Sequence, residues 1–177
     1  MKKLIVSMLT GALILGGTVS AVSADTTAEG KTNVGYTSGA ITDPENPSNP
    51  TWSVSIPKDF VFTDGNLTKN VDVTLNEIGG VAFSNDKKVQ IDVKSDNAYK
   101  LENATNTNVG ELAYTLTYGK DAGEVTNPDN ATIGDLTKDT MKLEGNATLE
   151  ATQLTNVGVD GTYKDVLTYT VHAAVAK

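Results

Sequence analysis

Residues 89–94 read Val-Gln-Ile-Asp-Val-Lys, and this stretch shows most clearly which fold class the chain belongs to. Its apolar side chains alternate with polar ones, so the apolar residues recur with a period of two. Because successive side chains of a β-strand point to opposite faces of a sheet, this period predicts a strand with one buried and one solvated face. The same period recurs in four other stretches: 52–56, 71–75, 114–118 and 167–173.

The phase of the alternation predicts which residues form the core. The residues on the apolar face are expected to be mostly buried: Val73, Ile91, Leu116, Leu167 and Val171. Their neighbours on the opposite face are expected to be mostly exposed: Asp92, Thr117 and Thr168.

Turn-forming residues separate these stretches, as in Asp64-Gly65, Gly79-Gly80 and Asn127-Pro128-Asp129. A less regular apolar run covers residues 141–151, and residues 121–139 show no pattern, which predicts a surface loop there. No window supports a long amphipathic helix. The sequence therefore predicts an all-β fold, an antiparallel β-sandwich of about seven strands, over residues 51–177.

The first 24 residues have the features of a secretory signal peptide. Lys2 and Lys3 precede an uncharged apolar run over residues 4–19, and Val22-Ser23-Ala24 places small side chains before Asp25. A permanent anchor would need about twenty apolar residues, and this run is shorter and interrupted by glycine and threonine. Residues 25–50 form a turn-rich segment with three prolines, within which residues 32–37 are predicted to be a short strand.

Charge and cysteine content exclude several classes of function. The chain of 177 residues has no cysteine, which excludes a disulfide framework and thiol chemistry. Its 14 basic residues are all lysine; without Lys2 and Lys3, 12 lysines face 22 acids, a net charge of −10. Such a chain repels phosphate backbones and anionic lipid, so we expect no nucleic-acid binding and no membrane binding after signal cleavage.

Few residues could carry chemistry. The only histidine, His172, falls on the outward phase of its stretch and is expected to face solvent without partners. We therefore predict no catalytic residues and no cofactor. The best-placed calcium candidates are the acids of the patternless segment: Asp121, Glu124, Asp129 and Asp135. Trp52 lies on the apolar phase, which favours core packing over stacking against a surface ligand such as a sugar.

Three segments carry a resemblance to a known family: residues 52–62 (WSVSIPKDFVF), 89–101 (VQIDVKSDNAYKL) and 161–174 (GTYKDVLTYTVHAA). Together they resemble the immunoglobulin-like sandwiches of small exported surface proteins of Gram-positive bacteria and, more loosely, the WxL cell-wall-binding domain. WxL domains carry two Trp-x-Leu triplets, and this chain has Trp52-Ser53-Val54 and Tyr169-Thr170-Val171 instead. The resemblance implies a secreted protein that is extracellular or associated with the cell wall.

Three functions follow from these observations. The first is a secreted, non-enzymatic structural or adhesive module of the cell surface, with cell-wall polysaccharide or other surface proteins as partners. The second is a self-assembling fibre subunit, in which residues 31–38 add a strand to a neighbouring molecule. The third is a polysaccharide-binding or hydrolysing domain that uses Trp52 and the acids.

Overall fold

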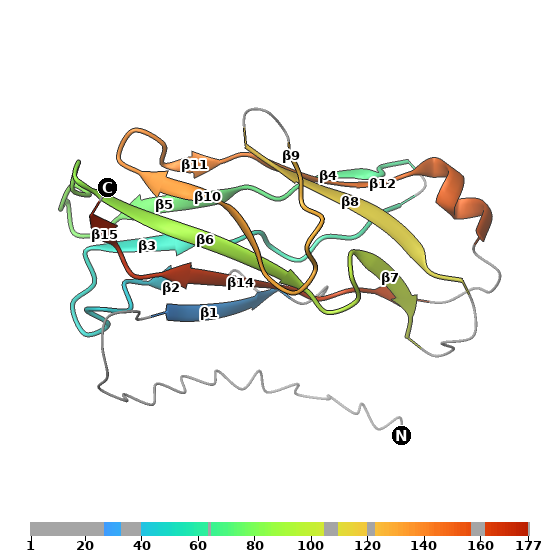
Figure 1. Ribbon diagram of the computed structural model, residues 1–177, viewed down its shortest axis with the longest axis horizontal. Coiled ribbons are helices and arrows are strands. Elements are labelled where there is room, and N and C mark those ends of the chain that lie inside the picture. The colour runs from blue at the N-terminus through green and yellow to red at the C-terminus, as the bar shows by residue number, and fades with distance from the viewer. Residues whose placement is uncertain are drawn as a thin grey trace, which may run out of the picture.

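A computed structural model describes residues 27–32, 40–63, 65–104, 110–119, 123–156 and 162–176. Within these ranges the regular elements are strands, apart from one 3-10 turn, η1 (Ala151–Asn156). The strands form antiparallel sheets around a shared hydrophobic core (Figure 1). The all-β class is therefore confirmed. The predicted signal peptide lies outside the described residues, and so does the predicted strand at 32–37 except for Thr32.

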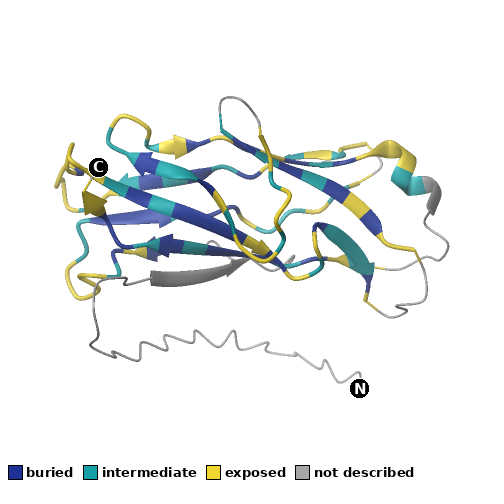
Figure 2. Ribbon diagram, in the orientation of Figure 1, coloured by how far each residue is buried: buried dark blue, intermediate teal, exposed yellow. Residues whose placement is uncertain are grey.

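The first sheet has the strand order β1-β14-β6-β10. Its strands are β1 (Thr27–Thr32), β14 (Leu167–His172), β6 (Lys87–Ser95) and β10 (Ala131–Thr137), and β15 (Val175–Ala176) also pairs with β6. The stretch that decides the fold class thus lies in an internal strand, β6, between β14 and β10. Internal position explains why its apolar face is so completely buried: Val89, Ile91 and Val93 have almost no exposed surface (Figure 2).

The second and third sheets share a long two-stranded ribbon. The second sheet has the order β11 (Lys142–Leu143), β5 (Val73–Glu77), β3 (Trp52–Ser55) and β2 (Ala40–Thr42). The third has the order β13 (Tyr163–Lys164), β7 (Lys100–Asn103), β8 (Leu112–Tyr118), β12 (Gly145–Leu149) and β4 (Thr68–Asn70), with β9 (Gly123–Glu124) also on β8. Residues 71–72 separate β4 from β5, and residue 144 separates β11 from β12. These interruptions and the very short strands β2, β9, β13 and β15 add strand segments beyond the seven or so predicted.

Gly145 and the partly buried Asp72 carboxylate connect the two strands of this ribbon where the strands are interrupted. The backbone N–H of Val71 donates to the Gly145 carbonyl at 2.9 Å, and the Gly145 N–H donates to Asp72 Oδ1 at 3.0 Å. Lys142 forms an ion pair with Asp72 at 2.6 Å. A Cβ at position 145 would overlap the ring of Tyr118, so only glycine fits there.

The predicted core is confirmed at all five positions. Val73, Ile91, Leu116 and Val171 are completely buried, and Leu167 nearly so. Trp52 also belongs to the core: it is 4% exposed, and its ring packs edge-on against Phe83 with centroids 6.1 Å apart.

The prediction that residues 121–139 form a surface loop is wrong in its second half. Residues 131–137 form β10, which pairs with β6 over its length, and the pairing shifts by one residue between Thr132 and Gly134. This β-bulge is built on Gly134, whose φ of 148° favours glycine. The extra residue changes the phase, so Ile133 and Leu136 are both buried although they lie three positions apart. A search for strict alternation therefore misses the strand.

Two of the three residues predicted to be exposed are buried. Asp92 is 3% exposed and Thr168 is 8% exposed, whereas Thr117 is partly exposed. Both buried residues lie on the outer face of the first sheet, on the internal strands β6 and β14. Side chains on such strands have neighbours in register on both sides, and these neighbours cover them even on the face away from the core.

Candidate functional site

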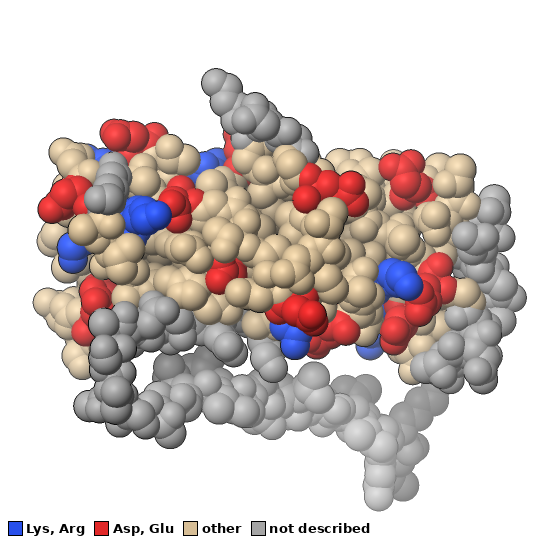
Figure 3. Space-filling model, viewed as in Figure 1, with Lys and Arg blue, Asp and Glu red and all other residues tan. Residues whose placement is uncertain are grey.

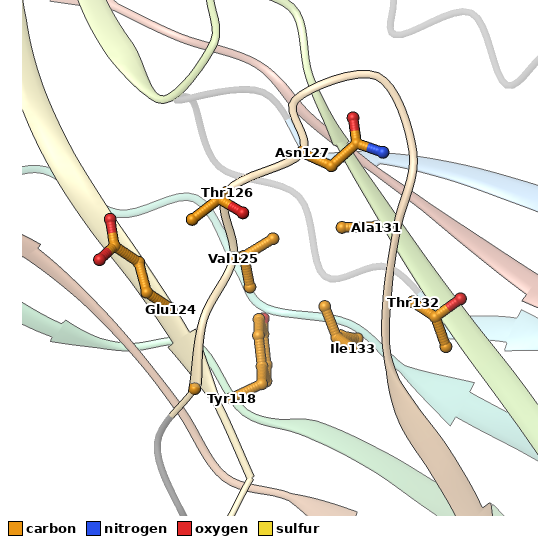
Figure 4. Close-up of a pocket in the computed structure, with 9 residues that line it drawn as sticks. Tyr118, Glu124, Val125, Thr126, Asn127, Ala131, Thr132 and Ile133 are labelled. Atoms are coloured by element: carbon orange, nitrogen blue, oxygen red, sulfur yellow. The ribbon is translucent and has the colours of Figure 1, made fainter.

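A cleft of about 310 Å³ lies where the chain leaves the third sheet and enters the first. Its walls are β9 with the residues that follow it, 125–127, and the first half of β10 (Figure 4). Val125 and Ile133 point toward each other across the loop, Tyr118 lies between them, and Thr132 points away. Such a volume, apolar inside with polar groups at its edge, lies at the lower end of the range for small-ligand sites.

The side of the Tyr118 ring forms the floor of the cleft, and the Tyr118 hydroxyl forms hydrogen bonds inside the core. Tyr118 OH donates to the Val71 carbonyl at 2.7 Å and lies 2.8 Å from Tyr169 OH. A phenol has a single proton to donate, so Tyr169 must be the donor to Tyr118. Burial raises the pKa of both phenols well above the ordinary value. Both hydroxyls therefore stay protonated at neutral pH.

The rim of the cleft is held by the turn that follows β6. Tyr99 OH donates to the Asn127 carbonyl at 2.9 Å, and the Ser95 N–H donates to the Pro128 carbonyl at 2.9 Å. The Asn127 side chain closes the loop on itself, because its amide donates to the Asn130 carbonyl and its oxygen accepts the Asp129 N–H. The loop is thus fixed on both sides of its tip.

Behind this turn lies a buried carboxylate, Asp165, that accepts four hydrogen bonds. Its Oδ2 accepts from Ser95 Oγ at 2.8 Å and from Tyr114 OH at 2.5 Å. Its Oδ1 accepts from the backbone N–H groups of Asn97 at 3.0 Å and Val166 at 2.7 Å. We define these residues as the Asp165 network. It ties the turn after β6 to the start of β14 and to β8.

The same turn contains two residues in the left-handed region of φ, Ala98 at 53° and Tyr99 at 58°. Such conformations cost non-glycine residues on the order of 1–3 kcal/mol each and persist only where surrounding contacts fix them. Here the Tyr99 N–H donates to Ser95 Oγ at 2.7 Å, and the Tyr99 ring packs edge-on against Tyr114. Burial, with the nearby Asp165 carboxylate, raises the pKa of Tyr99 to about 12.

A second buried carboxylate, Asp92, lies on the outer face of the first sheet and also accepts four hydrogen bonds. Its Oδ1 accepts from Thr132 Oγ1 at 2.8 Å and Gln90 Nε2 at 3.1 Å. Its Oδ2 lies 2.8 Å from His172 Nε2 and accepts from Asn130 Nδ2 at 3.3 Å. We define these residues as the Asp92 network. Burial alone would raise the pKa of Asp92, but the bonds from Thr132, His172 and Gln90 together outweigh it and lower the pKa.

The prediction that His172 faces solvent without partners is wrong. Its side chain is 21% exposed and contacts the Asp92 carboxylate directly. The phase of the strand was right, because His172 does lie on the outer face. What the phase could not show is that β6 brings a carboxylate beside it on that face, 80 residues away in sequence.

The three calcium candidates that the structure describes, Glu124, Asp129 and Asp135, do not come together as one site. Asp121 lies outside the described residues, Glu124 and Asp129 are exposed, and Asp135 forms an ion pair with Lys88 at 2.7 Å. Over the described ranges there is no group of three His, Asp or Glu side chains placed to hold a metal ion. The ion pair between Asp135 and Lys88 instead connects β10 to β6.

His172 and Asp92 form a hydrogen-bonded pair on the outer face of the first sheet. His172 has a carboxylate beside it, as in catalytic triads, but Thr132 donates its proton to Asp92 and not to the imidazole. On the face shown in Figure 3, acidic side chains are spread over the surface with lysines between them, and no continuous basic area is visible there.

Comparison with protein-family models, with curated proteins and with solved structures finds no match to this chain. Within the ranges that the structure describes, no helix has the length and apolar character needed to cross a membrane.

Sequence reasoning missed Asp165, Ser95 and Tyr99 as a connected group. Ser95 and Asn97 were recognisable as turn residues, but nothing in the sequence marks Asp165 as their partner 70 residues further on. A short polar residue directly before an apolar strand is usually a solvated turn residue.

Proposed function

We propose that this protein is a secreted, non-enzymatic module of the cell surface with an immunoglobulin-like β-sandwich, serving a structural or adhesive role. The partners that fit this role are cell-wall polysaccharide and other surface proteins. The features of residues 1–24 support export, and the absence of cysteine is compatible with an oxidising compartment.

The observation that carries the proposal is how the buried carboxylates are used. Asp92 and Asp165 each accept four hydrogen bonds, from side chains or backbone groups on separate segments of the chain. A carboxylate has about four acceptor positions, so none remains for a substrate. Catalytic carboxylates need a free position toward a reacting atom. These two groups instead fasten the sandwich, as expected for a module that must stay folded outside the cell.

The pairing of β1 favours the single module over the fibre subunit. The fibre hypothesis requires residues 31–38 to pair with a neighbouring molecule. Lys31 and Thr32 pair within their own chain, opposite Thr168 and Leu167 of β14. A chain whose first strand covers its own sheet edge has that edge protected against addition of another strand.

Fractionation of the producing cells tests the proposal. The protein should be found in the medium or the wall fraction, with an intact mass that begins at Asp25. Purified mature protein should also sediment with isolated cell-wall material. Retention in the cytoplasm with residues 1–24 still attached would contradict export, and hydrolysis of wall polymers by the pure protein would contradict a non-enzymatic role.

A further inference from the structure

The outer face of the third sheet carries an ordered array of uncharged polar side chains. Strands β4, β12 and β8 pair side by side, and two rows of residues cross them in register. The first row is Thr68, Thr148 and Thr115, and the second is Asn70, Asn146 and Thr117. We call these six residues the Thr/Asn face. Leu116 and Ala147, on the opposite phase, are completely buried, so the six side chains point outward.

One of the six residues is already engaged, because Asn70 Oδ1 accepts the Asp72 N–H at 3.2 Å. The contacts that its threonines make are long: Thr68 Oγ1 to Thr148 Oγ1, Thr115 Oγ1 to the Thr148 carbonyl, and Thr117 Oγ1 to the Asn146 carbonyl are each 3.4 Å. Hydroxyl hydrogen bonds of normal strength are about 2.7–2.8 Å long. The Asn146 amide is exposed and makes no hydrogen bond to the described residues. The threonine hydroxyls and the Asn146 amide can therefore turn to a ligand without losing strong internal bonds.

Charged side chains lie around this face and not on it. Glu124 extends the second row beyond Thr117, and Glu150 follows the last residue of β12. At the opposite end, Lys142 contacts both Asp72 and Glu144. The whole chain has a net charge of −8. An acidic border around a neutral centre disfavours an anionic polymer and leaves an uncharged, hydroxyl-rich partner as the complementary one.

We infer that the Thr/Asn face binds a neutral polysaccharide laid across β4, β12 and β8. This inference rests on the proposed surface function and adds the contact surface and the charge class of its partner. The hydroxyls of the polymer exchange hydrogen bonds with the Thr and Asn side chains, and the paired strands repeat these groups at about 4.8 Å across the sheet. Threonine is stiff at χ1, so ordering the face on binding sacrifices little rotamer freedom.

Sedimentation with insoluble neutral polysaccharides tests this inference. Mature protein is mixed with chitin, with cellulose and with an insoluble β-1,3-glucan, at low salt and in 1 M NaCl, beside anionic polygalacturonate immobilised on beads. At least one neutral polymer should retain the protein equally at both salt concentrations, whereas polygalacturonate should not retain it. If the protein binds none of the three neutral polymers, or if high salt abolishes the binding, the inference is overturned.

A double variant locates the surface. Thr117→Val with Thr148→Val removes two hydroxyls from the face while keeping β-branched side chains of the same shape, so the strands should still form. Loss of two hydrogen bonds should weaken binding roughly tenfold. The matched control, Thr74→Val with Thr170→Val, changes outward threonines on β5 and β14 in other sheets. Unfolding curves show that both variants are folded before binding is compared.

The outcomes separate this inference from the proposed function. If the face variant binds as well as the wild type, the Thr/Asn face is not the binding surface. The same conclusion follows if the control variant loses as much binding as the face variant. If the protein still reaches the wall in cells, the proposed function stands in either case. Cytoplasmic retention would instead remove the proposed function, whatever the polysaccharide assay shows.

Discussion

Asp165 and Asp92 are both buried carboxylates with four hydrogen bonds each, yet their partners differ in kind. Asp165, in the interior at the turn after β6, accepts from two backbone N–H groups and two hydroxyls. Asp92, on the outer face of the first sheet, has only side-chain partners. Backbone groups and a core tyrosine cannot turn to water when the carboxylate is lost, whereas side chains near the surface can. The difference indicates that Asp165 contributes more than Asp92 to the free energy of unfolding.

The largest effect should come from Asp165→Ala. It leaves two backbone N–H groups and the Tyr114 hydroxyl without an acceptor, and it loosens the turn that contains Ala98 and Tyr99. We expect a loss of about 3–5 kcal/mol in the free energy of unfolding, measured with urea. Asp165→Asn serves as control, because it keeps the size but replaces one acceptor with a donor, and it should recover part of the loss. A loss below that of Asp92→Ala would reverse the comparison.

Asp92→Ala should have a smaller effect, about 1–3 kcal/mol, measured in the same way. Gln90, Asn130 and Thr132 can then reach solvent, and His172 is already partly exposed. The pairing of β10 with β6 should weaken most, because two of the four partners precede or belong to β10. Faster amide hydrogen exchange in β10 than in β14 would locate the change. Equal exchange in both strands would contradict this assignment.

Acidification tests the charge of Asp92 without removing the side chain. Its pKa is lower in the folded protein than the ordinary value of 3.8. The ionised form therefore stabilises the fold above about pH 4, and this contribution is lost as the pH falls through the folded pKa. Asp72 also has a lowered pKa and contributes in the same direction. The difference between wild type and Asp92→Asn in urea should shrink toward zero from pH 6 to pH 2, and a constant difference would contradict the assignment.

The smallest effect should be that of His172→Ala, about 1 kcal/mol of unfolding free energy, because one of four bonds to Asp92 is lost. His172→Gln, which can still donate to Asp92, should recover most of it. A double-mutant cycle with Asp92→Ala should give a coupling energy of similar size. Any binding to polysaccharide should be unchanged, since His172 lies on a different sheet from the Thr/Asn face. A coupling energy of zero would show that the contact does not stabilise the protein.

The strands with strict alternation were predictable from the sequence, and the reason is local. In residues 89–93 and 167–171, each side chain's face is set by the pleat alone, so burial of Ile91, Leu167 and Val171 follows from counting by two. The burial of Trp52 follows in the same way. Strand β10 was not predictable by this count, because the bulge between Thr132 and Gly134 shifts the pairing with β6 and changes the phase of the strand.

The sequence by itself determined the all-β class, the core faces of the alternating strands and the acidic, cysteine-free character of the chain. Only the tertiary structure decided which polar residues on outward-facing positions and in turns are buried. Asp92 and Thr168 are buried on an outer face because neighbouring strands cover them, and Asp165 is enclosed by a turn far from it in sequence. The Thr/Asn face likewise exists only because β4, β12 and β8 pair in one register. Alternation depends on neighbours along the chain, whereas burial of a polar group depends on which strands pair, and pairing joins residues that lie far apart in sequence.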